Sequence, residues 1–147
     1  MYKKILCPID GSATSNAGMN EAILLAKDQN AELRFLYVID TFFPILDMSG
    51  DLNVIYIAEI LHKNGTKLLK HAVDAAHRAA VSADSKVIEA VGARVSKFVL
   101  NEAEDWPADL IVMGTHGLRG IGRLVLGSDA QTVVSSSTVP VLLVKNR

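Results

Sequence analysis

Apolar runs that read as strands alternate with stretches of helical periodicity along this chain, and the alternation constrains the fold more than any other feature. Nearly continuous apolar runs are typical of strands buried on both faces of a parallel sheet, and right-handed crossovers through helices join such strands. The strand-like runs span residues 4–9, 31–39, 87–91, 110–113 and 139–144, and the helix-like stretches span residues 13–29, 53–82, 92–106 and 127–137. The pattern predicts an α/β fold, a five-stranded parallel doubly wound sheet with helices on both faces, Rossmann-like.

Composition narrows the class of protein. A chain of 147 residues, half of them hydrophobic, suits a single domain over residues 1–147 with a substantial core. The formal net charge is −1, with 15 basic and 16 acidic residues and no basic run, so we expect no nucleic-acid partner. No apolar stretch reaches the roughly 18 to 20 residues that span a bilayer, so we expect a cytoplasmic protein with no membrane contact. The single cysteine, Cys7, lies inside the first strand, where we expect a buried, unreactive thiol.

A glycine-rich loop follows the fourth predicted strand. Gly114 and Gly117 are followed after nine residues by Gly127 and Ser128, the spacing G-x-x-G, nine residues, G-S. Glycines let a backbone approach a ligand closely, and a following helix offers free N–H groups to an anion. The spacing differs from the dinucleotide fingerprint, and no lysine precedes Ser128 as in a P-loop. The loop is a candidate phosphate site, with an ordinary turn as the alternative, in which Ser128 and Gln131 form a capping box.

A second polar loop follows the first predicted strand and runs from Pro8 through Asp10 to Ser12. In open α/β sheets, ligands bind beyond the carboxyl ends of the strands, where the strand order reverses. If the first and fourth strands are neighbours, this loop and the glycine-rich loop line one crevice. A carboxylate that accepts hydrogen bonds from a nucleoside, beside amides and a hydroxyl that suit phosphates, favours a nucleotide site.

These residues resemble a known family over essentially the whole length of the chain. The chain is similar to single-domain universal stress proteins of the UspA superfamily, in their ATP-binding branch, whose nucleotide signature has the same glycine spacing. The segments that carry the resemblance are residues 2–12, 37–40, 108–117, 127–128 and 139–144.

The resemblance implies binding of ATP, together with Mg²⁺ or Mn²⁺. It implies that Asp10 and the backbone of Pro8 and Ile9 face the nucleoside and that the main chain of Val38 meets the adenine edge. The triphosphate is expected above Met113 and against Gly114, Thr115, His116, Gly117, Gly127 and Ser128. Asp129 is counted with these nucleotide-binding positions. It departs from the pattern of ATP binders, because its carboxylate favours the helix dipole but repels phosphate unless a metal ion intervenes or the side chain points away. Ala130 is a second departure, because a hydroxyl is common at that position.

Three functions remain open at this point. The first is a regulatory module in the stress response that binds ATP and changes its interactions with an unknown protein partner. The second is a slow ATP hydrolase or a protein that phosphorylates itself, with Ser12, Thr115 or Ser128 as acceptor. No catalytic base is evident in the sequence, so efficient turnover is not expected and no catalytic residue is assigned. The third is a dimeric interaction module that has lost its nucleotide.

The last predicted strand is apolar and is expected at a sheet edge, where unpaired amides invite pairing with another chain. The resemblance implies a homodimer through this strand, at Val139, Val141 and Leu143.

We expect the remaining charged and apolar groups to be structural. His62, His71 and His77 are predicted to be solvated on the long helix, and Glu89, Glu102, Glu104 and Asp105 are predicted to be solvated charges. The apolar cluster Phe42, Phe43, Pro44, Ile45 and Leu46 is predicted to pack on the long helix, with a lid or a docking patch as alternatives.

Overall fold

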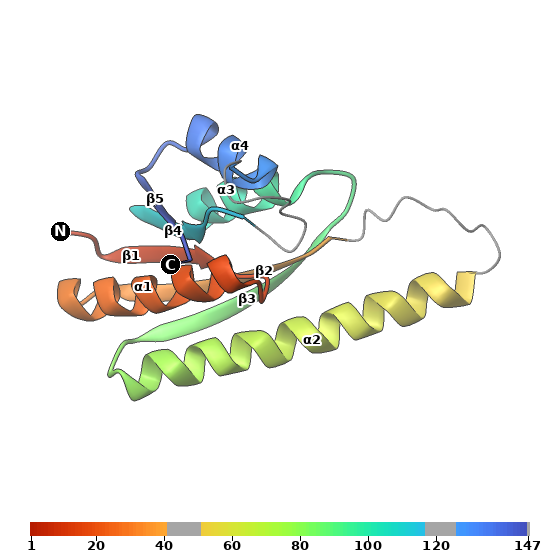
Figure 1. Cartoon of the computed structure of the whole chain (residues 1–147), viewed down its shortest axis with the longest axis horizontal. Coiled ribbons are helices and arrows are strands. Elements are labelled where there is room, and N and C mark those ends of the chain that lie inside the picture. Colours follow the sequence, from red (N-terminus) through yellow and green to blue (C-terminus); the bar gives the residue numbers. More distant parts are fainter. Residues whose placement is uncertain (41–50, 117–125, 147) are drawn as a thin grey trace.

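The computed structural model describes residues 1–40, 51–116 and 126–146, and it contains a parallel sheet with the strand order β3-β2-β1-β4-β5. The strands are β1 (Lys4–Pro8), β2 (Glu32–Asp40), β3 (Ala83–Ala90), β4 (Leu110–Gly114) and β5 (Val141–Val144). The helices between them are α1 (Ala13–Gln29), α2 (Asp51–Arg78), α3 (Val95–Asp105) and α4 (Ser128–Ser136). The predicted five-stranded doubly wound sheet is confirmed (Figure 1).

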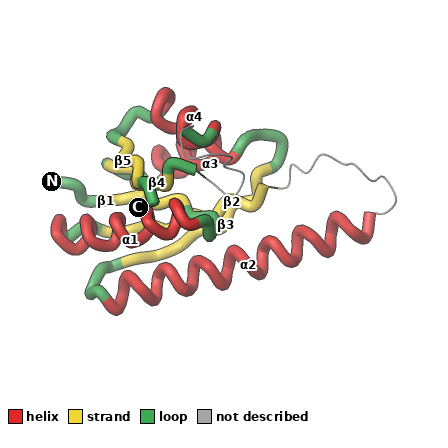
Figure 2. Tube along the Cα trace, viewed as in Figure 1, coloured by secondary structure: helices red, strands yellow, loops and turns green. Residues whose placement is uncertain are grey.

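Helices cover both faces of the sheet, as Figure 2 shows. α1 and α2 pack on one face, where residues such as Met19 and Leu69 meet Phe35 of β2. α3 and α4 pack on the other face, where Val99 and Val133 meet strand residues that include Leu36. Successive residues of a strand point to opposite faces, which explains why these strands read as continuous apolar runs in the sequence.

Cys7 contributes to the core on the α1 and α2 face and is 0% exposed. Its burial raises the pKa of the thiol far above its usual range, because the low-dielectric core disfavours the thiolate. The thiol is therefore protonated and inert at neutral pH, as the sequence predicts.

Local signals in the sequence set the ends of α1. Ser12 is the N-cap, and its hydroxyl accepts a hydrogen bond from the amide of Ser15 at 3.2 Å. Asn30 ends the helix in the left-handed conformation, with φ of 51°, and its N–H donates to the carbonyls of Ala26 and Lys27. The stop predicted at Asn30 is confirmed.

Several boundaries differ from the sequence prediction, most of all the start of β3 and the end of α2. β3 begins at Ala83 rather than at residue 87, and α2 ends at Arg78 rather than near residue 82. Residues 84–86 are exposed because β3 lies at the edge of the sheet. The first half of the strand therefore has no apolar pattern by which the sequence could predict it. Ala80, with φ of 62°, stops α2 in an alanine-rich run that contains no glycine or proline to signal the end.

The prediction that Glu102 is a solvated charge is wrong. Its side chain on α3 is 1% exposed, and it accepts hydrogen bonds from Arg34 of β2 at 3.0 Å and from Lys86 of β3 at 2.5 Å. Arg34 also binds Asp84, at 2.6 Å, and its guanidinium lies 4.6 Å from the ring centroid of Trp106. Buried carboxylates are tolerated where cations satisfy them, so this network joins α3 to β2 and β3.

Candidate functional site

The strand order reverses between β1 and β4. The chain runs from β1 to β2 and β3 on one side and then returns to β4 on the other, where Ile5 and Leu6 pair in register with Leu110 and Ile111. The expectation that the first and fourth strands are neighbours is confirmed. The loops after β1 and β4 therefore meet at the crevice where doubly wound folds bind ligands.

The loop after β1 is held by its own polar side chains. The carboxylate of Asp10 accepts the amide of Ser12 at 2.9 Å, and the amide of Asp10 donates to the buried hydroxyl of Ser15 at 3.0 Å. Gly11 between them has φ of 85°, a conformation that favours glycine. This arrangement fixes the carboxylate of Asp10 at the carboxyl edge of the sheet.

Gly114, at the end of β4, touches the first turn of α1. A β-carbon on Gly114 would lie 2.6 Å from the carbonyl carbon of Thr14 and 2.8 Å from the amide nitrogen of Ser15. Real side chains do not come so close to backbone, so the contact requires glycine. The first glycine of the loop thus joins strand to helix, in addition to any approach to a ligand.

His116 is fixed by residues from both loops. Its carbonyl accepts hydrogen bonds from the hydroxyls of Thr14 and of Ser12, the latter at 3.4 Å. Its Nδ1 lies 2.9 Å from the hydroxyl of Thr115. Its Nε2 is buried and has no hydrogen-bond partner in the described part of the chain. A buried polar atom without a partner is costly, so Nε2 is available to bond a group that lies outside the described residues.

The two ends of the glycine-rich loop meet. The amide of Gly127 donates to the carbonyl of Thr115 at 2.9 Å, and the amide of Thr115 donates to the carbonyl of Val144 at 3.0 Å. Gly114, Thr115, His116, Gly127 and Ser128 are thereby brought together, with the buried Met113 beneath them on β4. Gly117 lies outside the described residues.

The alternative interpretation, a capping box between Ser128 and Gln131, is wrong. Gly127 is the N-cap of α4, its carbonyl accepts the amide of Gln131 at 2.9 Å, and Ser128 is the first helical residue. Because glycine has no side chain, the N-cap residue supplies no side-chain cap to the first N–H groups of α4. Free helical amides suit an anion, which favours the phosphate interpretation over the ordinary turn.

Both departures on α4 have a structural explanation. The carboxylate of Asp129 accepts the amide of Ser96, in the first turn of α3, at 3.0 Å. Ala130 is 3% exposed and packs in the core between α3, α4 and the sheet. The carboxylate of Asp129 therefore caps the neighbouring helix α3, and this bond to Ser96 holds it in place. Ala130 contributes to the packing of the core.

Val38 lies at the carboxyl end of β2. The amides of Glu32 and Ile9 bond across to the carbonyls of Lys3 and Leu36, so the even-numbered residues of β2 turn their main chain toward β1. Val38 has the same orientation, but β1 ends at Pro8, opposite Leu36. Its N–H and C=O thus point to the β1 side, past the last paired residue of that strand.

Thr14 and Ser15 were not predicted as site residues, although the hydroxyl of Thr14 bonds the loop after β4 and the hydroxyl of Ser15 bonds the loop after β1. A hydroxyl-rich helix start is a common cap, so nothing in the sequence distinguished these residues. The other candidates lie elsewhere: His62, His71 and His77 are exposed on α2, as predicted, and the apolar cluster at residues 42–46 is outside the described residues.

Absences within residues 1–40, 51–116 and 126–146 are also informative. No group of three or more His, Cys, Asp or Glu side chains there could hold a metal ion by itself. No helix among these residues is long and apolar enough to cross a membrane. The hydroxyls of Ser12 and Thr115, considered above as phosphoryl acceptors, are both engaged in hydrogen bonds. The described site combines backbone amides, hydroxyls and one fixed carboxylate with His116, whose Nδ1 is paired with the hydroxyl of Thr115.

Comparison with known proteins gives one consistent match. The model of the Universal stress protein family matches residues 1–145. A universal stress protein of Methanocaldococcus jannaschii is 37% identical over 145 residues, which cover 99% of this chain and 83% of that protein. Among solved structures, the universal stress protein UspA from Lactobacillus plantarum superposes with a TM-score of 0.85 at 22% identity, with 97% of each chain covered.

Two further solved structures hold a bound adenine nucleotide. A universal stress protein in complex with cAMP is similar with a TM-score of 0.72 at 24% identity, over 99% of each chain. A universal stress protein family protein from Arabidopsis thaliana with AMP bound has a TM-score of 0.71 at 12% identity, over 99% of this chain and 92% of that one. At these identities the likeness concerns the fold.

Proposed function

Because the chain belongs to the universal stress protein family, we propose that it binds an adenine nucleotide, ATP with Mg²⁺ or Mn²⁺, in the crevice between the loops after β1 and β4. In this proposal Asp10 and the backbone of Pro8 and Ile9 face the nucleoside, and the main chain of Val38 meets the adenine edge. The phosphates lie against Gly114, Thr115, His116, Gly117, Gly127 and Ser128. The bound ion neutralises part of the phosphate charge.

The observation that carries the proposal is the buried Nε2 of His116, which has no hydrogen-bond partner among residues 1–40, 51–116 and 126–146. When the hydroxyl of Thr115 donates to Nδ1, Nε2 carries the proton and needs an acceptor. A phosphate oxygen is such an acceptor, and the uncapped amides at the start of α4 supply further donors. The residues present therefore fit an anionic ligand. The structures with AMP and cAMP support an adenine nucleotide as that ligand.

We further propose that the protein is a nucleotide-dependent regulatory module in the stress response. The loop after β4 and the start of α4 are joined to the last strand by the bond from Thr115 to Val144. A ligand at the loop would thus contact a residue that is hydrogen-bonded to β5, the edge strand through which we propose a homodimer. Occupancy of the site and the dimer surface are in this way physically connected.

Calorimetric titration with ATP, AMP and cAMP, with and without Mg²⁺, tests the proposal. His116→Ala is the variant and His62→Ala, at an exposed position on α2, is the matched control. Loss of one charge-assisted hydrogen bond weakens ATP binding roughly tenfold in His116→Ala. Binding by the control remains unchanged. No heat of binding with any of the three nucleotides would refute the proposal.

A further inference from the structure

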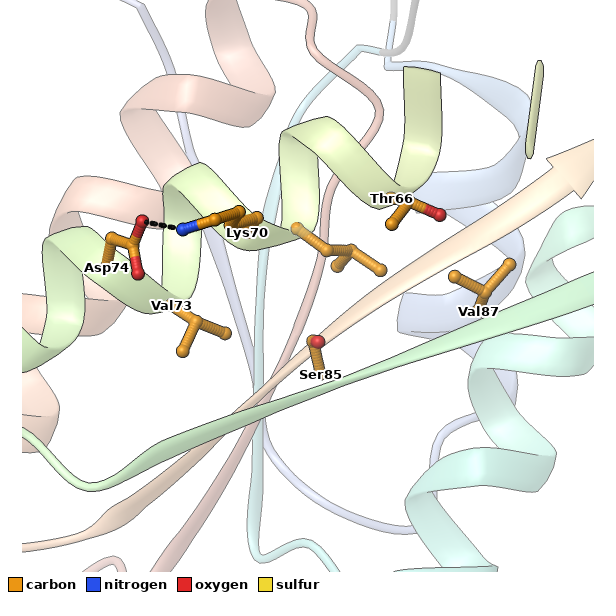
Figure 3. A pocket seen from close by; sticks show the side chains of 7 residues that line it. Thr66, Lys70, Val73, Asp74, Ser85 and Val87 are labelled. Atoms are coloured by element: carbon orange, nitrogen blue, oxygen red, sulfur yellow. Dashed lines mark hydrogen bonds and ion pairs between the residues drawn. The ribbon is translucent and has the colours of Figure 1, made fainter. Parts of the chain in front are cut away.

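The free edge of β3 lies next to a hollow between this strand and α2. The hollow has a volume of about 310 Å³ and is lined by Thr66, Leu69, Lys70, Val73 and Asp74 of α2 and by Ser85 and Val87 of β3 (Figure 3). In Figure 1 the two elements run side by side. None of the residues that line the hollow belongs to the proposed nucleotide site.

The hydrogen bonds of β3 identify which of its groups face outward. The amide of Leu33 in β2 donates to the carbonyl of Ser82, so the even-numbered residues of β3 turn their main chain toward β2. The odd-numbered residues turn theirs to the open edge. At one end of the strand the carbonyl of Ala83 lies 3.2 Å from Nε2 of His77, and at the other the carbonyl of Glu89 accepts the amide of Val91. The main-chain groups of Ser85 and Val87 lie between these satisfied ends.

Ser85 and Val87 combine two properties. Their side chains line the hollow, and their main-chain N–H and C=O groups face the open edge of the sheet. A strand added beside β3 would take up those groups and would place every second side chain over Leu69, Val73 and Val87. Backbone pairing and an apolar pocket are the two elements of strand addition.

The hollow and the adjoining surface of α2 together carry a small surplus of positive charge. A continuous surface along α2 shares Thr66 and Lys70 with the hollow and also includes Glu59, His62, Lys63 and Lys67. Lys70 is paired with Asp74 at 2.8 Å, whereas Lys63 and Lys67 form no ion pair with the described residues. The two linings together hold Lys63, Lys67 and Lys70 against Glu59 and Asp74, a surplus of one positive charge that favours an acidic occupant.

We propose that β3 is a docking edge for an extended, acidic peptide segment of a partner protein, which adds a strand beside Ser85 and Val87 and places apolar side chains in the hollow under α2. The segment alternates apolar and acidic residues, because one face meets Leu69 and Val73 and acidic groups meet Lys63 and Lys67. The interaction is independent of the nucleotide site.

The test uses a fluorescent peptide of alternating valine and glutamate, titrated with the full chain and followed by anisotropy. Ser85→Pro removes the outward N–H while leaving the bonds to β2, since proline is tolerated on an edge strand. Ser85→Ala is the matched control, because it keeps the N–H and removes only the hydroxyl. Loss of one hydrogen bond in Ser85→Pro weakens binding roughly tenfold, whereas Ser85→Ala stays within about twofold.

Charge is tested separately with Lys63→Glu and Lys67→Glu together, which weaken binding of the glutamate peptide and strengthen binding of a lysine counterpart. If Ser85→Pro does not fold, hydrogen exchange of the native chain decides, because the peptide is expected to slow exchange at Ser85 and Val87. Absence of saturable binding, equal affinity of Ser85→Pro and Ser85→Ala, or unchanged exchange would overturn the proposal. A native dimer that Ser85→Pro dissociates would overturn it in favour of a second copy at this edge.

Discussion

Gly114 at the end of β4 and Thr14 in the first turn of α1 lie so close that a β-carbon on Gly114 would come within 2.6 Å of the Thr14 carbonyl carbon. The contact locks the loop after β4 to the helix that follows β1. The crevice between the two loops is therefore part of the packed fold.

Gly114→Ala is expected to destabilise the protein without nucleotide by about 1–3 kcal/mol, the usual cost of overpacking. Gly92→Ala is the comparison, because a β-carbon there meets no atom within 4 Å and only the φ of 71° is unfavourable. Chemical denaturation of both variants measures the difference. A Gly114→Ala variant as stable as the native protein would contradict the close contact.

Glu102→Ala is expected to cost about 3 kcal/mol, the lower end for breaking a buried ion pair, because Arg34 keeps Asp84 and Lys86 reaches solvent. Glu104→Ala, at an exposed position on the same helix, is expected to change the free energy of unfolding by less than about 0.5 kcal/mol. Denaturant unfolding of the two variants side by side provides the measurement. Similar losses in both would mean that Glu102 is not the anchor of α3.

The burial of Glu102 could not be predicted from the sequence. Alternation of strands and helices predicted the sheet and the crevice, because both depend on local periodicity and on general rules of connection. Glu102, Glu104 and Asp105 look alike in the sequence, and burial of Glu102 depends on Arg34 and Lys86 arriving from other elements. The role of Asp129 was open for the same reason, since its partner Ser96 belongs to a different helix.

Stability is expected to fall at high pH because of Cys7. Burial raises the pKa of the folded thiol above the unfolded value of about 8.5. The unfolded chain releases this proton first, so stability is full below that pH and decreases above it by up to about 1.4 kcal/mol per pH unit. Tyr37, whose pKa is also raised by burial and by Asp10, adds to the loss at higher pH. Unfolding of Cys7→Ala between pH 8 and 10 is expected to show a smaller slope, and equal slopes would contradict this account.

The proposed dimer gives a prediction about side-chain direction in β5. Val139, Val141 and Leu143 pack against the core of their own subunit, whereas Leu142 is 36% exposed. Leu142→Asp is therefore expected to yield a folded monomer, and Leu143→Asp is expected to lose stability. Light scattering with size exclusion gives the mass of each variant. A folded Leu142→Asp dimer would argue against association through this face of β5.

The most direct test of the proposed nucleotide site is an amide-resolved NMR titration of the native protein with ATP and Mg²⁺. The account predicts shifts at residues 8–12, at Val38, at residues 114–116 and at residues 127–129, while Ser85 and Val87 on β3 stay unchanged. Shifts confined to α2 and β3, with none beside His116, would contradict the placement of the nucleotide between β1 and β4.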